Sequence, residues 1–251
     1  MEIVVRCAEG SSGLVFQSSL NDRYQKFKLI SCLSNVGKKQ HMLGKNNKLN
    51  VNETTLKILA LYRSDYRRAL HTREIARSVA TDVQPVSVQL RRLDGAGILT
   101  SAARGKHKEY ALMLSNLLTK YYVSLAEMYT TITFLDRYFL IKRVLEELQR
   151  GDENLLGTIV LFGSFAAERA DKRSDVDILT ITEHQPIRDT VRTIETVIGR
   201  DINVTSMTPL QFMEGLRRAS PFEREIVDHH IVLQDIDRFC TLMWRVFGIW
   251  G

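Results

Sequence analysis

Residues 158–181 read TIVLFGSFAAERADKRSDVDILTI, and this stretch decides the fold of the C-terminal half of the chain. Two apolar runs frame it: the first ends in Gly163-Ser164, and the second follows Asp175 and Asp177. This order predicts a strand, a tight turn into a short helix, and a second strand. Because side chains alternate along a strand, Asp175 and Asp177 lie on one face.

The chemistry of this stretch points to phosphate and a cation. Two neighbouring carboxylates repel each other unless something positive binds them, and hard oxygen ligands suit Mg²⁺. The Gly163-Ser164 turn would present backbone N–H groups at a helix N-terminus, where phosphate binds well. These are the parts that phosphoryl or nucleotidyl transfer requires. A simpler interpretation stays open, in which Asp175 and Asp177 only make an edge strand soluble.

Gly163-Ser164, followed after ten residues by the Asp-x-Asp pair, resembles the nucleotidyltransferase superfamily related to polymerase β, and most closely its minimal members. The resemblance covers roughly residues 155–235. It implies an α/β (α+β) fold with a small mixed sheet flanked by helices. The implied reaction transfers a nucleoside monophosphate, with ATP or another nucleoside triphosphate as substrate and two Mg²⁺ ions. The implied residues are Gly163, Ser164 and Ser174 for the nucleotide, and Asp175, Asp177 and Asp201 for catalysis and metal.

The chain also departs from that pattern. Minimal members commonly read Gly-Ser-x-Ala-Arg-Gly, and Ala167 and Glu168 stand here in place of the last two residues. On the third strand, expected over residues 201–207, Asn203 falls where many members have Asp. Asn cannot accept a proton, so the third carboxylate is expected to be Asp201, two residues earlier on the same face. Three basic residues either face the triphosphate or lie in a solvated loop: Arg169, Lys172 and Arg173.

Length and composition set outer limits. With 251 residues, 44% of them hydrophobic and 25% charged, the chain has room for two domains with proper cores. No apolar run reaches the roughly 18 residues of a membrane span, and the N-terminus lacks a secretory-type segment. Three scattered cysteines indicate neither a disulfide framework nor a zinc cluster. We therefore expect a cytoplasmic protein with no membrane partner.

Charge is divided unevenly along the chain. Residues 53–115 carry 11 Lys and Arg against 6 Asp and Glu, whereas residues 116–251 carry 16 against 20. Residues 1–52 are also basic, with 8 against 3. A nucleic-acid partner is therefore expected for the front half. Residues 1–50 show no period and are interpreted as a poorly ordered basic extension, with a basic arm along DNA as the alternative.

Residues 51–115 predict three short helices and then a hairpin with a basic tip. This order resembles the winged helix-turn-helix of bacterial and archaeal regulators. The resemblance implies double-stranded DNA as the partner and makes the third helix, over residues 84–93, the recognition helix. The candidate contacts are Gln84, Ser87, Gln89, Arg91 and Arg92 on that helix, with Arg104, Lys106 and Lys108 in the wing. A winged helix used only for protein contact is the alternative.

Residues 116–151 predict one long connecting helix, because residues 114–150 contain neither Gly nor Pro. Apolar residues recur at alternating spacings of four and three: Tyr121, Leu125, Met128, Ile132, Leu135 and Phe139. This seam packs either on the chain's own domains or on the same helix of a second copy. Because winged-helix regulators generally act as dimers, we expect a homodimer. The nucleotidyltransferase domain is then predicted over residues 152–251.

Two functions remain in competition. The first is a nucleotidyltransferase with a DNA-binding winged helix, which transfers AMP from ATP to an acceptor hydroxyl. Antitoxin-type members of the family imply a partner protein as that acceptor. The second is a transcriptional regulator whose nucleotidyltransferase-like domain is a weak or inactive nucleotide sensor or a dimerisation module. Glu168 and Asn203 favour the second. His184, His229 and His230 are not expected to be ligands, since adjacent side chains point apart.

Overall fold

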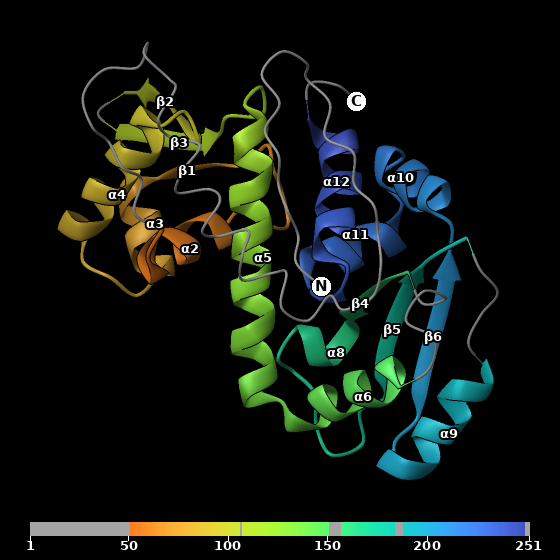
Figure 1. The fold of residues 1–251 in the computed structure, drawn as a ribbon. Coiled ribbons are helices and arrows are strands. Elements are labelled where there is room, and N and C mark those ends of the chain that lie inside the picture. Colours follow the sequence, from red (N-terminus) through yellow and green to blue (C-terminus); the bar gives the residue numbers. More distant parts are fainter. Residues whose placement is uncertain (1–50, 106, 151–156, 184–187, 249–251) are drawn as a thin grey trace, which may run out of the picture. The chain divides into compact units, whose positions relative to one another are not determined.

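A computed structural model describes residues 51–105, 107–150, 157–183 and 188–248 (Figure 1). These residues belong to one compact unit, Asn47–Gly251. Several predictions lie outside the described residues: the basic extension at 1–50, Lys106 in the wing, the domain boundary near residue 151, and His184. No helix in the described part of the chain is both long enough and apolar enough to cross a membrane.

The N-terminal lobe, residues 51–112, has the element order of a winged helix-turn-helix. Its elements are α2 (Glu53–Ala60), β1 (Ala69–His71), α3 (Thr72–Ser78), α4 (Val83–Gly95), β2 (Leu99–Arg104) and β3 (His107–Leu112). The three strands form an antiparallel sheet in the order β1-β3-β2. The three predicted helices and the hairpin are present. Strand β1 was not predicted, because its three residues are too few to show an alternating pattern.

Local signals explain where these helices begin. Asn52 is the N-cap of α2, and its side chain accepts a hydrogen bond from the Thr55 amide at 2.9 Å. Thr72 is the first residue of α3, and His71 is the N-cap. Glu74 reaches back to the His71 amide and completes the cap at 3.4 Å.

The predicted connecting helix is helical but not continuous. It divides at Tyr138 into α5 (Leu117–Arg137) and α6 (Phe139–Gln149), because Tyr138 has a non-helical ψ of 76°. The Tyr138 ring stacks on Phe134, with ring centroids 4.3 Å apart. The bend lets α6 bury its own apolar stripe, which contains Ile141, Val144 and Leu148. Neither Gly nor Pro marks this bend, so it could not be predicted from local residue types.

The C-terminal lobe, residues 142–248, contains a mixed four-stranded sheet in the order β6-β5-β4-β7. Strand β5 pairs parallel with β6 and antiparallel with β4, which is also antiparallel to β7. The α/β (α+β) class with a small mixed sheet is therefore confirmed. The elements after α6 are β4 (Thr158–Phe162), α8 (Gly163–Ala166), β5 (Val176–Ile181), α9 (Arg188–Ile198), β6 (Ile202–Met207), α10 (Pro209–Arg217), α11 (Pro221–Asp228), β7 (Ile231–Gln234) and α12 (Ile236–Phe247).

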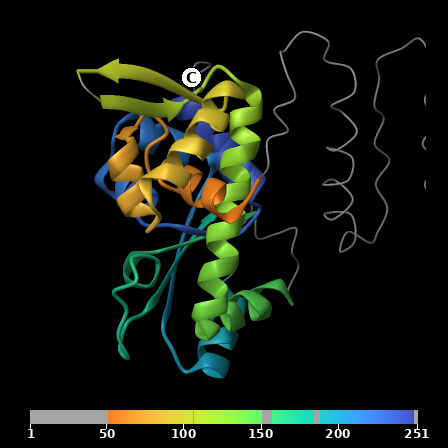
Figure 2. The ribbon, with the colours of Figure 1, turned by 90° about the vertical axis from the view of Figure 1, so that its left-hand side faces the viewer.

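The two lobes share a hydrophobic core. One buried cluster runs from Leu59 and Leu90 in the N-terminal lobe, through Val123 on α5, to Val160 and Phe239 in the C-terminal lobe. A second cluster lies between α6, α9 and the sheet. Helix α5 packs against both α2 and α12. It runs from the β2–β3 hairpin to α6 (Figures 1 and 2). The lobes are thus packed together through α5 rather than joined by a free linker.

A buried ionic network crosses the same junction. The Arg63 guanidinium donates to Glu127 Oε2 at 2.6 Å and to the His230 carbonyl at 2.7 Å. The His230 ring lies 3.0 Å from Glu127 Oε1 and 2.8 Å from the Val227 carbonyl. Burial alone would raise the pKa of Glu127, but Arg63 and His230 hold it at about 2. The network links three segments: the turn that follows α2, the middle of α5, and the residue directly before β7.

Candidate functional site

The Gly163 turn is built directly against one of the two carboxylates. In the β4–β5 pair, Phe162 stands opposite Asp177, so the turn that follows Phe162 lies beside the Asp177 side chain. Gly163 has a φ of +69°, and a Cβ at this position would overlap the Asp177 carboxylate. Only glycine therefore fits here without a shift. This close approach brings the predicted phosphate-binding turn and the predicted metal-binding residue together.

Asn203 joins the two carboxylates on the neighbouring strand. It stands opposite Asp177 in the parallel β5–β6 register. Its side-chain nitrogen donates to Asp177 Oδ1 at 3.1 Å and to Asp175 Oδ2 at 3.5 Å. Asp175 is exposed and Asp177 is half-buried, so solvent reaches the site. The site thus contains two carboxylates and one amide, all carrying oxygen atoms that suit Mg²⁺.

Asp201, expected to be the third carboxylate, does not join this group. Among the described residues, no three Asp, Glu, His or Cys side chains come close enough together to hold one metal ion. Asp201 precedes β6, and its carbonyl accepts a hydrogen bond from the Val176 amide at 3.0 Å. The structure therefore places Asn203, and not Asp201, between Asp175 and Asp177, because the register sets residue 203 opposite residue 177.

Ser174, expected at the nucleotide, holds the loop in front of β5. Its hydroxyl accepts from the Asp171 amide at 2.8 Å and donates to Asp171 Oδ1 at 3.2 Å. Its carbonyl accepts from Arg200 at 3.2 Å. These contacts fix the backbone that leads into Asp175. A contact between Ser174 and a nucleotide stays a prediction. The three basic residues of this loop region are exposed: Arg169, Lys172 and Arg173.

Glu168, which replaces the motif glycine, has a φ of +55° and pairs with a distant arginine. Arg137, the last residue of α5, donates two hydrogen bonds to its carboxylate, at 2.6 and 3.1 Å. This bidentate ion pair compensates the negative charge of Glu168, which lies four residues after Ser164. Sequence reasoning could not find it, since 31 residues separate the partners. It ties the end of α5 to the candidate phosphate loop.

The predicted recognition helix, α4, presents one polar face. Val86, Leu90 and Leu93 are buried against the core. Gln84, Ser87 and Arg91 follow one another at spacings of three and four residues and lie on the opposite face. Arg92 is exposed as well and lies about as far from the buried stripe as Arg91, on the other side of the exposed face, whereas the half-buried Gln89 lies on the flank. Both arginines therefore project from the exposed side of α4.

The cations of the predicted wing are partly neutralised within the chain. Arg104 pairs with Glu109 at 3.3 Å, and Lys108 pairs with Asp94 at 3.1 Å. Both pairs are solvent-exposed and therefore weak. Their cations can exchange these partners for phosphate at little cost.

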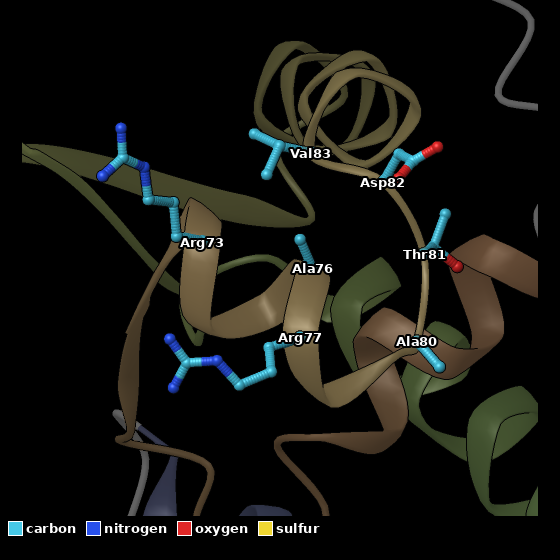
Figure 3. A pocket seen from close by; sticks show the side chains of 7 residues that line it. All are labelled: Arg73, Ala76, Arg77, Ala80, Thr81, Asp82 and Val83. Atoms are coloured by element: carbon cyan, nitrogen blue, oxygen red, sulfur yellow. The ribbon is translucent and has the colours of Figure 1, made fainter.

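Two further arginines, which the sequence reasoning missed, line a surface hollow beside α4. Arg73 and Arg77 lie one turn apart on the exposed side of α3 (Figure 3). The hollow continues over Thr81, Asp82 and Val83, where α4 begins (Figure 3). In helix-turn-helix proteins the helix before the recognition helix crosses the DNA backbone. The spacing of four between two arginines was the sequence signal for this pair.

Comparison with known proteins identifies the C-terminal lobe. Residues 142–239 match the family described as Polymerase beta, Nucleotidyltransferase. These residues form a nucleotidyltransferase domain of the polymerase β type. The match contains β4 to β7, the Gly163 turn and both carboxylates. It leaves out the N-terminal lobe. No curated protein matches the chain.

Two solved structures share limited similarity with the chain. A crystal structure titled as a toxin-antitoxin with AMP-PNP has 13% identity and a TM-score of 0.31, over 41% of this chain and 82% of that chain. A homodimeric winged helix-turn-helix DNA-binding domain from Mycobacterium bovis, a possible ArsR-family transcriptional regulator, has 18% identity and a TM-score of 0.28, over 45% and 90%. At these TM-scores, neither similarity says anything about the function of this chain.

Proposed function

We propose that this protein binds DNA through its N-terminal lobe and transfers a nucleoside monophosphate in its nucleotidyltransferase domain. The reaction would take AMP from ATP and attach it to an acceptor hydroxyl, with release of pyrophosphate. The observation that carries the proposal is the contact between the Gly163 turn and Asp177, with Asp175 on the same face. A triphosphate at the turn would have its reacting phosphate beside both carboxylates.

The residues present fit a magnesium ion. Mg²⁺ in phosphate-transfer sites is usually held by one or two carboxylates together with the substrate's own phosphates. Asp175 and Asp177 supply two carboxylates, and rotation of the Asn203 amide would add a carbonyl oxygen. When bound, the metal would polarise the reacting phosphate and lower the pKa of the attacking hydroxyl. The proposal of two ions rests on family resemblance, since this site has two carboxylates and not three.

The roles of the chain's own residues follow from their positions. Gly163 and Ser164 would bind the β- and γ-phosphates through backbone N–H groups. Asp175 and Asp177 would hold the metal, and Asn203 would orient both of them through its amide. Asn203 cannot take a proton from the acceptor, so Asp175 and Asp177 are the two groups able to do so among the described residues of the site. A hydroxyl on a partner protein is the proposed acceptor.

The test is Mg²⁺-dependent release of pyrophosphate from ATP. The Asp175→Ala, Asp177→Ala double variant should abolish the release, whereas Asp201→Ala should leave it within about twofold, since Asp201 does not join the site. The comparison separates the structural assignment from the sequence prediction. An equal loss of pyrophosphate release in both variants would show that Asp201 is also required for the reaction. No release from the wild type, despite ATP binding, would count against transfer.

A second candidate function is favoured by Asn203. With an amide in place of a third carboxylate, the domain would bind a nucleotide without turning it over and act as a sensor for the DNA-binding lobe. ATP binding without pyrophosphate release, together with a change in DNA affinity on adding ATP, would support the sensor. Unchanged DNA affinity with saturating ATP would contradict it.

The proposed DNA contacts centre on the polar face of α4. Gln84, Ser87 and Arg91 would reach base edges, while Arg73 and Arg77 on α3 would contact phosphates. The expected phosphate contacts also include the wing cations Arg104, Lys106 and Lys108. Arg92 would contact bases or phosphates beside Arg91, and Gln89 would contribute from the flank. Arg91→Ala should weaken specific binding by about 1–3 kcal/mol. Arg217→Ala on α10 is the matched control, because Arg217 is also an exposed arginine but lies outside the N-terminal lobe, and it should leave DNA binding unchanged.

The salt dependence of DNA affinity distinguishes phosphate contacts from base contacts. Replacing Arg73 and Arg77 together by Ala should lower affinity for all sequences alike. It should also flatten the dependence of log affinity on log salt by about 0.9 for each phosphate that the variant no longer neutralises. Unchanged affinity in all these variants would favour a winged helix that contacts protein.

A further inference from the structure

Helix α5 carries a row of apolar side chains that the described part of the chain leaves in solvent. Leu118, Tyr121, Met128 and Ile132 are exposed by 53%, 50%, 41% and 55%. Leu125, between them, is half-buried. We call these five residues the α5 seam. Scattered exposed hydrophobic residues are ordinary, but five on one face of one helix form a continuous patch.

The opposite face of α5 is already covered. Val123, Ala126, Glu127 and Phe134 are buried against the rest of the chain. With 100° between successive residues, these side chains lie roughly on the other side of the helix axis from the seam. Helix α5 is therefore apolar on both faces, and its own lobes cover only one. An apolar stripe along a helix normally faces another part of the protein or a partner and not solvent.

The spacing of the seam suits a second helix as its partner. Residues 118, 121, 125, 128 and 132 follow one another at intervals of three, four, three and four. This is the repeat by which two helices pack side by side, each residue fitting between four of the facing helix. The seam keeps this repeat over nearly four turns.

The area is close to what a stable dimer needs. Phe, Tyr and Trp bury about 150–250 Å² each when fully covered, and about 200 Å² serves here for each large side chain. At these exposed fractions, the seam and the neighbouring Leu117, which is 62% exposed, together offer about 500 Å² in each copy. Two copies together approach the roughly 1,200 Å² at which specific interfaces begin, before any flanking contacts are added.

We propose that the α5 seam is covered by the α5 seam of a second copy of this chain, in a twofold-symmetric dimer. A symmetric interface matches one patch with itself, and the repeat of the seam is complementary to its own copy. The chain's own residues 1–50 are a poorer occupant, since they are basic, with 8 Lys and Arg against 3 Asp and Glu up to residue 52, and show no apolar period. This dimer does not depend on nucleotidyl transfer.

The test is the mass of the full-length chain in solution. Light scattering or sedimentation at about 1–100 µM should give twice the mass of one chain. Ile132→Glu should weaken the dimer by about 100-fold, since symmetry places each new charge in the interface twice. Leu210→Glu on α10 is the matched control, because Leu210 is also exposed, by 58%, and lies outside the seam. It should leave the dimer intact.

Three outcomes would overturn the proposal. In the first, the wild type has the mass of one chain at 100 µM. In the second, the Ile132→Glu and Leu210→Glu variants dissociate equally. In the third, the Ile132→Glu variant remains a dimer. If Ile132→Glu fails to fold, the thermal midpoint of the wild type replaces it. That midpoint should rise with protein concentration for a dimer and stay constant for a monomer. Pyrophosphate release, measured on the same samples, reports on the nucleotidyltransferase site independently.

Discussion

Asn203 donates its side-chain amide to Asp177 over 3.1 Å, in the position where a third carboxylate would complete a metal site. This contact holds two acids together without a third negative charge. It also removes one proton acceptor from the site. The balance between a weak enzyme and a nucleotide sensor depends on this residue.

Replacing Asn203 by Asp is expected to increase pyrophosphate release from ATP. The new carboxylate restores a proton acceptor, which typically contributes 10²–10⁴-fold in rate where it is well placed. The same variant should be less stable in EDTA than the wild type, because three carboxylates repel one another, and it should gain more from added Mg²⁺. Thermal midpoints with and without Mg²⁺ measure this. Lower turnover in Asn203→Asp would mean that the amide itself is required.

Gly163→Ala is expected to damage the site through Asp177. An alanine at a φ of +69° costs about 1–2 kcal/mol wherever it occurs. At position 163 its Cβ also meets the Asp177 carboxylate, which adds about 1–3 kcal/mol of overpacking. Gly199→Ala is a close control, since Gly199 has a φ of +68° with no atom within 4 Å of an added Cβ. Gly163→Ala should lose ATP binding and more stability, whereas Gly199→Ala should lose stability only.

The Arg137–Glu168 pair yields a test of the phosphate loop. Arg137→Ala leaves the Glu168 charge uncompensated near the turn, so ATP affinity should fall by about three- to tenfold. Glu168→Gly restores the motif residue, removes both the charge and the strain of a φ of +55°, and should raise ATP affinity. With Glu168 already Gly, removing Arg137 should have little effect. An additive loss in the double variant would show that the two residues act separately.

Glu127 makes stability depend on acid pH. Its carboxyl group titrates near 4.5 when unfolded and at about 2 in the folded chain, where Arg63 and His230 favour the ionised form despite burial. A lowered pKa contributes stability that is fully present above pH about 4.5 and is lost as pH falls toward 2. The contribution is on the order of 3 kcal/mol. Urea unfolding at pH 7 and pH 3 should show part of this loss.

Glu127→Gln separates this network from other acids. It should be destabilised by about 3–5 kcal/mol at pH 7, because the largely covered Arg63 guanidinium loses its carboxylate partner. The difference from the wild type should shrink at pH 3. Glu214→Gln is the control, since Glu214 pairs with Arg218 at the surface and should matter by less than about 1 kcal/mol. A constant difference for Glu127→Gln at both pH values would contradict the assignment.

Local patterns in the sequence were sufficient for most elements. The strand, turn and strand around Gly163 followed from two apolar runs and a Gly-Ser pair, and the Asp175–Asp177 pair followed from alternation along β5. The three helices of the N-terminal lobe followed from apolar period and turn residues. These signals lie within about 20 residues of each other, which is why they could be read without a structure.

The features of the fold and the site that could not be predicted depend on contacts between segments far apart in the sequence. The parallel register that sets Asn203 opposite Asp177, and the pairing of Arg137 with Glu168, leave no local trace. The bend at Tyr138 has no Gly or Pro to mark it. The period of α5 correctly predicted an apolar row containing Tyr121 and Ile132. The period did not predict that this row faces solvent, because periodicity shows which residues share a helix face and not what that face packs against.

The measurement that tests the central claim most directly is pyrophosphate release from ATP with Mg²⁺, in the wild type and in the Asp175→Ala, Asp177→Ala variant. Nucleotidyl transfer predicts release by the wild type that stops when Mg²⁺ is chelated and is absent from the double variant. Release that persists in the double variant would contradict it. So would a wild type that binds ATP and releases no pyrophosphate with any protein fraction offered as the acceptor.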